Sequence, residues 1–335
     1  MKTALLAIGG NSLIREGEKG TIAEQRANVR RTAVQVTGLI RAGYSLVLTH
    51  GNGPQVGAAL LRSERGASQV PALPLDVCGA STQGEIGYLL QQALIIELRT
   101  AGLQTPVVTL LTQSLVSAND PSMSRPTKPI GPFYSFADIE ERKRLYGWDI
   151  VEDASRGYRR VVPSPEPIGV VEFETIQNLV NQGMLVIACG GGGIPVVQTR
   201  SGLRGVEAVI DKDRASAWLA ARLGVDLFII STDTDRVYLD YRKPTQRPLE
   251  HIGAAELSAH FKAGQFPPGN MGPKIESVLR FLNNGGKEAI ITSCENLCPA
   301  VFGKGGTHIF PENAAVSGPE FELADRNQQL SVEGR

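Results

Sequence analysis

The chain has 335 residues, of which 42% are hydrophobic and 20% charged, a composition typical of globular rather than disordered proteins. Its 34 basic and 34 acidic residues balance, which excludes the strong positive field that nonspecific nucleic-acid binding requires. No apolar stretch approaches the roughly 20 residues of a membrane span, and four scattered cysteines indicate a reducing compartment, so we expect a cytoplasmic protein without nucleic-acid or membrane partners.

Short apolar runs alternate with amphipathic helical patterns along most of the chain. Helices are predicted between the runs, including 21–41 and 81–100, which stop at Gly43 and Gly102. Near-continuous apolar strands that alternate with helices indicate an α/β fold, here a three-layer αβα sandwich around a central, mainly parallel sheet. The predicted strands are 2–8, 45–49, 106–111, 184–189, 227–231, 288–292 and 307–310.

Two regions break this alternation. From about residue 117 to 167 the chain is rich in proline and charge, which predicts a small inserted subdomain that we call the flap. Residues 311–335 are polar and without a period, which predicts a frayed tail.

Glycine is enriched, and its placement is informative. The 37 glycines make up about 11% of the chain, against roughly 7% in average proteins. Glycine-rich turns follow three predicted strands, at residues 9–11, 51–53 and 190–193. Ligands bind at the carboxyl ends of strands in open α/β sheets, and backbone amides there suit phosphate. Each turn alone could be merely a tight connection, but together they predict a site for an anionic substrate.

Established phosphate-binding signatures are absent, so the positive charge must come from elsewhere. The chain lacks the P-loop pattern, and its glycine turns do not fit G-x-G-x-x-G in context. Three lysines have restricted settings: Lys128 lies among flap prolines, Lys212 lies between two aspartates, and Lys274 follows a Gly-Pro pair. A compact ammonium suits a moving phosphoryl group. Singly, each lysine could be an ordinary surface charge, and Lys212 is the strongest candidate.

Histidine and cysteine offer no competing chemistry. None of the four histidines has the spacing of a zinc site, so we expect no metal bound by protein ligands. Cys294 and Cys298 have no second pair, and we interpret them, like Cys78, as packing residues. His50 is open between a structural role and a hydrogen bond to the ligand.

Six short motifs occur in order across about residues 1–310: AIGGNSL (7–13), THGNGPQVG (49–57), PLDVCGA (74–80), KPIGPFY (128–134), VEAVIDKD (206–213) and GPKIE (272–276). No single motif would be specific, but the six in sequence resemble the carbamate kinase family. Carbamate kinases belong to the amino acid kinase fold family, whose members place the phosphoryl acceptor on the N-terminal half and ATP or ADP on the C-terminal half of one continuous sheet. The resemblance implies an N-terminal lobe over 1–205, which includes the flap, and a C-terminal lobe over 206–310.

The resemblance implies a role for each matching residue. The first turn would cradle the transferring phosphoryl, and the second would bind the carbamate end of carbamoyl phosphate. Lys128 would close over the substrate from the flap, while Lys212 and Lys274 would stabilise the transferring group and Asp213 would orient them. The substrate-binding residues so implied are Gly9, Gly10, Asn11, Gly51, Asn52 and Gly53, and the nucleotide-binding residues are Asp211, Ser231, Asp233, Tyr238, Met271 and Gly272.

The implied reaction is reversible phosphoryl transfer between carbamoyl phosphate and ADP, which gives ATP and carbamate. Mg²⁺ would be bound through the nucleotide phosphates, and the family pattern also implies a homodimer across the helical face of the N-terminal half. Two alternatives stay open: a kinase of this fold for another small carboxylate, such as an acylated amino acid, and a noncatalytic metabolite sensor. A dehydrogenase ranks third.

Overall fold

The structure is a computed structural model that describes residues 2–15, 17–152, 157–267 and 271–312. Within these residues the main sheet has eight strands in the order β15-β17-β16-β12-β1-β2-β9-β3, and every neighbouring pair is parallel except β16 with β17. The strands are β1 (Lys2–Ile8), β2 (Tyr44–His50), β3 (Val107–Thr109), β9 (Leu185–Ile187), β12 (Leu227–Thr232), β15 (His251–Gly253), β16 (Ala289–Ser293) and β17 (Thr307–Phe310).

The predicted α/β class and mainly parallel sheet are therefore confirmed. All seven predicted strands are present in the sheet, with boundaries that shift by at most two residues. Strand β15 was missed because its three residues carry too short an apolar pattern to be told from a loop. The sheet is continuous across the expected lobe boundary, since β12 pairs with β1.

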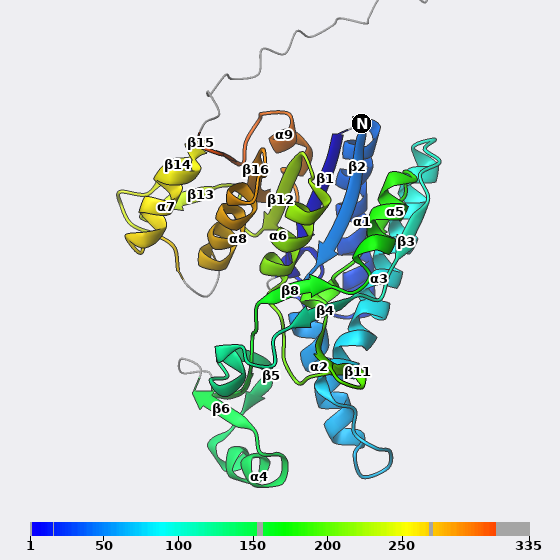
Figure 1. The fold of residues 1–335 in the computed structure, drawn as a ribbon, viewed down its shortest axis with the longest axis vertical. Coiled ribbons are helices and arrows are strands. Elements are labelled where there is room, and N and C mark those ends of the chain that lie inside the picture. The colour runs from blue at the N-terminus through cyan, green and yellow to red at the C-terminus, as the bar shows by residue number, and fades with distance from the viewer. Residues whose placement is uncertain (1, 16, 153–156, 268–270, 313–335) are drawn as a thin grey trace, which may run out of the picture.

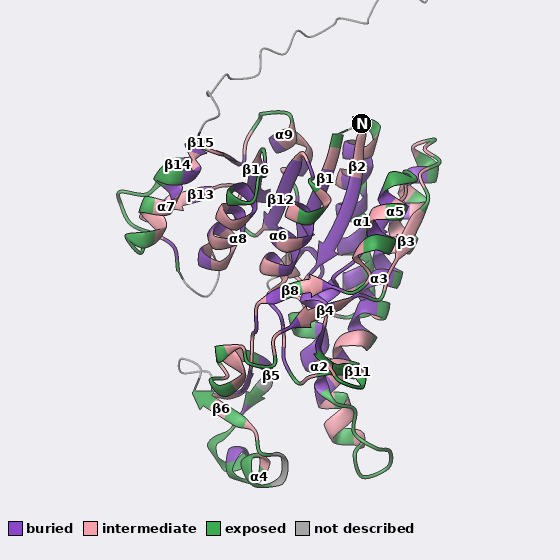
Figure 2. Ribbon diagram, in the orientation of Figure 1, coloured by how far each residue is buried: buried purple, intermediate pink, exposed green. Residues whose placement is uncertain are grey.

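Helices cover both faces of the sheet (Figure 1). On one face α1 (Ile22–Arg41), α3 (Leu75–Thr100) and α9 (Leu297–Val301) pack against Ala4, Leu6 and Ile8. On the other face α5 (Phe173–Asn181), α6 (Lys212–Leu223), α7 (Ala254–Lys262) and α8 (Met271–Asn283) contribute to a core with Leu5 and Ala7. Side chains alternate between faces along a strand, so β1 enters both cores. Figure 2 shows these central strands as buried.

The flap leaves the main sheet, as predicted. Within it β5 (Lys128–Tyr134), β7 (Tyr158–Val162) and β6 (Asp149–Glu152) form an antiparallel sheet beside α4 (Phe136–Tyr146). Figure 1 shows it standing away from the main body beside α2 (Gly53–Gly66). The two touch closely, because a Cβ at Gly57 would lie 3.1 Å from the Cα of Gly131.

A second sheet connects the flap to the body. Its order is β11-β10-β4-β8, with β4 (Gln113–Val116) and β8 (Pro167–Val170) on the two sides of the flap in sequence. The other two strands are β10 (Ile194–Thr199) and β11 (Gly202–Gly205), which follow the third glycine turn. The flap is thus anchored at both its ends to strands that pair with each other.

Helix α3 starts at Leu75, six residues before the predicted start at Ser81. Glycines lower helix propensity and obscured its first turns. Gly87, further along the helix, is explained by packing, because a Cβ there would lie 2.3 Å from the Cγ2 of Thr109 on β3. None of the described helices is long and apolar enough to cross a membrane. Of the predicted tail, residues 313–335 lie outside the described residues, so the frayed end stays a prediction.

The packing of α8 on the sheet makes a stability prediction. Phe281 is 1% exposed, and its ring meets that of Phe228 edge-on at 5.4 Å. Phe281→Ala should lower the free energy of unfolding by about 3–5 kcal/mol, since it leaves a cavity in the core. Phe302, which is 45% exposed, provides the control: Phe302→Ala should cost less than about 1 kcal/mol. Urea denaturation measures both, and equal losses would contradict the packing described.

Candidate active site

The first two glycine turns meet at the carboxyl edge of the main sheet. A Cβ at Gly51 would lie 3.7 Å from the amide nitrogen of Gly10 and 3.8 Å from the Cδ of Lys212. The amide of Gly51 donates to the carbonyl of Ile8 at 3.1 Å, which ties the two turns together. The end of β12 joins them, since a Cβ at Gly9 would lie 2.6 Å from the Ser231 carbonyl oxygen. Two turns and one predicted lysine thus share one place.

The third glycine turn has a different role. Its residues Gly190–Gly192 are buried, and a Cβ at Gly190 would lie 2.5 Å from the Nε2 of His50. A Cβ at Gly191, where φ is +66°, would lie 2.2 Å from the Nδ2 of Asn52. Only glycine fits here, because any side chain would displace the second turn's own side chains. This turn packs against the second one instead of offering an open third face to a ligand.

The second turn is held by its buried side chains. Asn52 donates through Nδ2 to the Oγ1 of Thr82 at 2.8 Å. His50 is 1% exposed and donates through Nδ1 to the Gly51 carbonyl at 3.0 Å, so it has a structural setting. Gly53 is the first residue of α2. In the first turn, Asn11 lies in the short 3₁₀ helix η1 (Gly10–Ser12), and its side chain lies outside what the structure describes.

Two lysines from distant segments share one buried carboxylate. Lys212 at the start of α6 donates to the Oδ1 of Asp213 at 2.5 Å, and Lys274 in the first turn of α8 donates to its Oδ2 at 3.0 Å. Asp213 is only 4% exposed. The structure therefore brings together three of the residues expected to carry catalysis.

Electrostatic attraction explains why Asp213 stays ionised although it is buried. Burial alone would raise the pKa of Asp213, but the ammonium groups of Lys212 and Lys274 outweigh burial and lower it. Burial lowers the pKa of Lys212, and the Asp213 carboxylate opposes that change. Two ammonium groups on one carboxylate leave one net positive charge beside the glycine turns. An anion placed there gains a charge-assisted contact in a largely water-excluded place.

The flap lysine reaches the same helix start. Lys128 donates through Nζ to the Oδ2 of Asp211 at 2.8 Å. The other oxygen of Asp211 accepts the amide of Asp213 at 2.9 Å, which caps the N-terminus of α6. Asp211 was expected at the nucleotide, yet both its oxygens are engaged here. These contacts join the flap to the helix that carries Lys212, and a role of Asp211 at the nucleotide stays a prediction.

A hollow of about 220 Å³ lies on the C-terminal half, beyond β12. Three of the residues expected at a nucleotide, Asp233, Tyr238 and Met271, line it. Met271 and Lys274 are three residues apart on α8, so they share a helix face and link the hollow to the lysines. Arg236, from the 231–238 segment that was also expected at the nucleotide, lines it as well, whereas sequence reasoning missed Tyr241 and Phe266, which carry no motif.

Two other expected nucleotide residues do not line this hollow. Ser231 is buried against the first glycine turn. The amide of Gly272 donates to the Pro267 carbonyl at 2.8 Å, and a Cβ at Gly272 would lie 2.9 Å from that oxygen. Gly272 therefore fixes how α8 begins.

Protein ligands for a metal do not gather at this site. Across the described residues, no three His, Cys, Asp or Glu side chains lie close enough to hold a metal ion. The carboxylates of Asp211 and Asp213 are already engaged by lysines and by an amide. This donor set fits a cation that is held by the phosphates of a bound nucleotide.

Comparison with known proteins defines the class. A sequence model of the amino acid kinase family matches residues 2–293, so the chain belongs to the amino acid kinase family. The carbamate kinase of Thermococcus kodakarensis is 47% identical over 93% of this chain and 100% of its own length. That of Pyrococcus horikoshii is 47% identical over 92% of this chain and 98% of its own.

A solved structure agrees with these sequences. Carbamate kinase from Giardia lamblia bound to AMP-PNP has a TM-score of 0.89 and 41% identity, and the match covers 93% of this chain and 99% of that one. Within its family the chain thus groups with the carbamate kinases. The resemblance drawn from the six motifs is confirmed.

The buried histidine makes a prediction about acid stability. Burial lowers the pKa of His50 to about 4 from 6.5. Below pH 6.5 the unfolded chain takes up this proton and the folded protein does not, so stability falls as pH drops from 6.5 toward 4. For one group this shift amounts to about 3 kcal/mol. His50→Gln should remove that part of the acid loss.

Urea midpoints measured at pH 7 and pH 4 check this prediction. The exposed His251→Gln is the matched control and should keep the acid loss of the unmodified protein. An unchanged pH dependence in His50→Gln would show that this histidine does not titrate as described.

Proposed function

We propose that the protein catalyses reversible phosphoryl transfer between carbamoyl phosphate and ADP, with ATP and carbamate as products. The observation that carries the proposal is the pair of lysines on Asp213 beside Gly10 and Gly51. The relatives named as carbamate kinases support the acceptor, and the AMP-PNP complex of the Giardia protein supports a nucleotide.

The residues suit a transfer that needs no covalent enzyme intermediate. Phosphoryl transfer spreads negative charge over the oxygens of the moving group while donor and acceptor oxygens lie in line. Lys212 and Lys274 would stabilise that charge, and Asp213 would keep both ammonium groups aimed. The backbone of the first two turns would hold the phosphoryl and carbamate ends, while Lys128 would approach from the flap. Catalysis would thus consist of positioning and charge neutralisation.

The two halves of the sheet would then divide the substrates. Residues 1–205, with the flap, would bind carbamoyl phosphate, and residues 206–310 would bind ATP or ADP at the hollow lined by Tyr238 and Met271. Mg²⁺ would be held through the nucleotide phosphates, where it neutralises part of their charge. All four cysteines are free, in keeping with the cytoplasmic location that we propose.

The assay that tests this proposal measures ATP formed from carbamoyl phosphate, ADP and Mg²⁺. Lys212→Ala should lower kcat by several orders of magnitude, because a charge that acts in the transition state is lost. Lys287→Ala is the matched control, since Lys287 is an exposed lysine paired with Asp226 at 2.5 Å. It should keep the activity of the unmodified protein.

Three outcomes would contradict the proposal. Near-normal ATP formation by Lys212→Ala would remove this lysine from the mechanism. Failure of the unmodified protein to form ATP, together with ATP-dependent phosphorylation of an acylated amino acid, would favour the alternative acceptor. No turnover at all with nucleotide binding retained would favour the sensor.

We also propose that the protein is a homodimer through the face formed by α3 and β3. Tyr88, Ile96 and Leu111 are exposed apolar residues that line one broad hollow on this face. Strand β3 is the last strand of the main sheet at that side. An exposed apolar patch at the end of a sheet is typical of a protein interface.

Charge placed on this face should separate the subunits. Ile96→Glu combined with Leu111→Glu is expected to halve the mass measured by light scattering, because two buried carboxylates would oppose association. Phe302→Glu, an equally exposed apolar position on the C-terminal half, should leave the mass unchanged. A dimer that persists in the double variant would place the interface elsewhere.

A further inference from the structure

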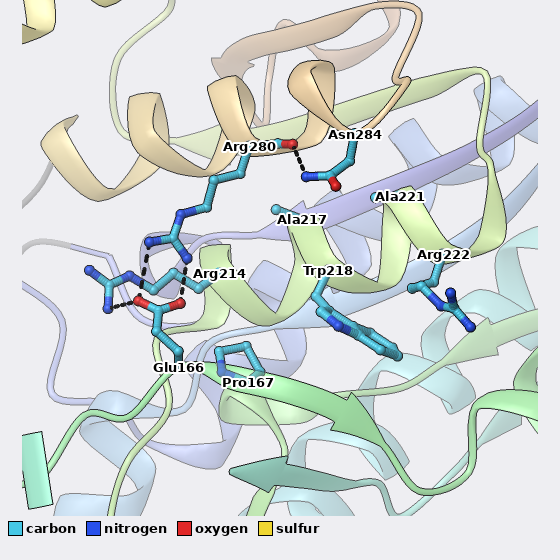
Figure 3. Close-up of a pocket in the computed structure, with 9 residues that line it drawn as sticks. All are labelled: Glu166, Pro167, Arg214, Ala217, Trp218, Ala221, Arg222, Arg280 and Asn284. Carbon is cyan, nitrogen blue, oxygen red and sulfur yellow. Dashed lines mark hydrogen bonds and ion pairs between the residues drawn. The ribbon is translucent and has the colours of Figure 1, made fainter. Parts of the chain in front are cut away.

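A second charged cluster lines the hollow drawn in Figure 3, on the same two helices as Lys212 and Lys274. There the Glu166 carboxylate lies between two guanidinium groups (Figure 3). Its Oε1 is 2.5 Å from the Nη1 of Arg214 and 3.2 Å from the Nη2 of Arg280, and its Oε2 pairs with the Nη1 of Arg280. Glu276 completes the cluster, 3.0 Å from Arg214 and 2.7 Å from Arg280.

The cluster adds a second ion pair between α6 and α8, next to the pair of Asp213 with Lys274. Arg214 directly follows Asp213 on α6, and Glu276 lies two residues after Lys274 on α8. The N-terminal parts of α6 and α8 are therefore joined twice. One link is the buried pair of Asp213 with Lys274, and the other is the more exposed pair of Arg214 with Glu276. Any shift of one helix along the other would strain both links.

Glu166 ties these helix starts to the base of the flap. It lies between β7, the last flap strand, and β8. Its amide donates at 3.0 Å to the Oδ2 of Asp120, whose Oδ1 caps the short helix η2 (Pro121–Ser124) on the incoming side of the flap. The same residue thus contacts the flap's two ends through its backbone and both lysine-bearing helices through its side chain.

The exposure of these ion pairs indicates that the cluster matters more for positioning than for the stability of the fold. The side chains of Glu166, Arg214 and Arg280 are 36%, 26% and 42% exposed, and ion pairs of such exposure contribute little to stability. Catalysis is far more sensitive to placement, because a displacement of about 1 Å can cost about 100-fold in rate. Loss of the cluster would therefore affect turnover much more than folding.

We propose that Glu166 is a positioning residue for phosphoryl transfer. It holds Arg214 and Arg280 together, fixes α6 against α8, and thereby keeps the ammonium group of Lys274 on α8 aimed from Asp213 on α6, beside Lys212. This inference rests on the proposed function, because it concerns the same lysines.

Glu166→Gln tests the inference, since it removes the charge and keeps the size. We expect kcat for ATP formation to fall about 10- to 100-fold, with KM for ADP and for carbamoyl phosphate changed less than about threefold. Glu256→Gln is the matched control, because Glu256 is an exposed helix glutamate that pairs only with His260 at 3.7 Å among the described contacts. It should leave kcat unchanged.

A double-mutant cycle distinguishes positioning from a general structural effect. If Glu166 acts through Lys274, then Glu166→Gln should lower kcat less than about twofold in a Lys274→Ala background, followed with a luciferase assay of ATP. Should Glu166→Gln prove too unstable to assay, Arg280→Gln takes its place in the same cycle, with the same expected direction.

The outcomes are separable from those of the proposed function. If the unmodified protein forms no ATP, the proposed function fails first. If it is active, an unchanged kcat in Glu166→Gln would overturn the inference. A full fall in kcat that persists without Lys274 would overturn it as well.

Discussion

The structure depends on one carboxylate that two ammonium groups share. Two like charges do not approach each other in a largely buried place unless an opposite charge lies between them, and Asp213 gives one oxygen to each lysine. The arrangement also keeps a net positive charge at the sheet edge in a chain that has no P-loop pattern. The order of the central strands and the packing of α6 against α8 bring these three side chains and the first two glycine turns close together.

The sheet does this by pairing segments that are far apart in the chain. Strand β1 lies between β2 and β12, so the first turn, the second turn and the end of β12 lie side by side. Lys274 reaches Asp213 across 61 residues of sequence, because α6 and α8 pack on the same face of the sheet. The flap adds Lys128 from a separate small sheet that Asp211 and Glu166 connect to the helix starts. The site is thus a meeting of helix and strand ends, as is usual for open α/β sheets.

Much of this could be predicted from the sequence, for identifiable reasons. Apolar runs mark strands that are covered on both faces, and Lys212 between two aspartates at a helix start already predicts an oriented ammonium group. The third turn was predicted, but its burial could not be. Its glycines are needed because His50, Asn52 and Ser114, which are distant in sequence, lie too close for any side chain there. The ion pair between Asp211 and the flap lysine could not be predicted either, and neither could the places of Tyr241 and Phe266 at the hollow. These contacts form only when distant segments of the chain pack together.

The central claim is that both ammonium groups act on one migrating phosphoryl group. A crystal structure with ADP, Mg²⁺ and a planar aluminium fluoride, which imitates that group in transit, tests it most directly. We expect the Nζ atoms of Lys212 and Lys274 each within about 3 Å of a fluoride, with Asp213 still bridging them and Gly10 and Gly51 on the opposite side. A complex in which either lysine points away from the aluminium centre would contradict the account.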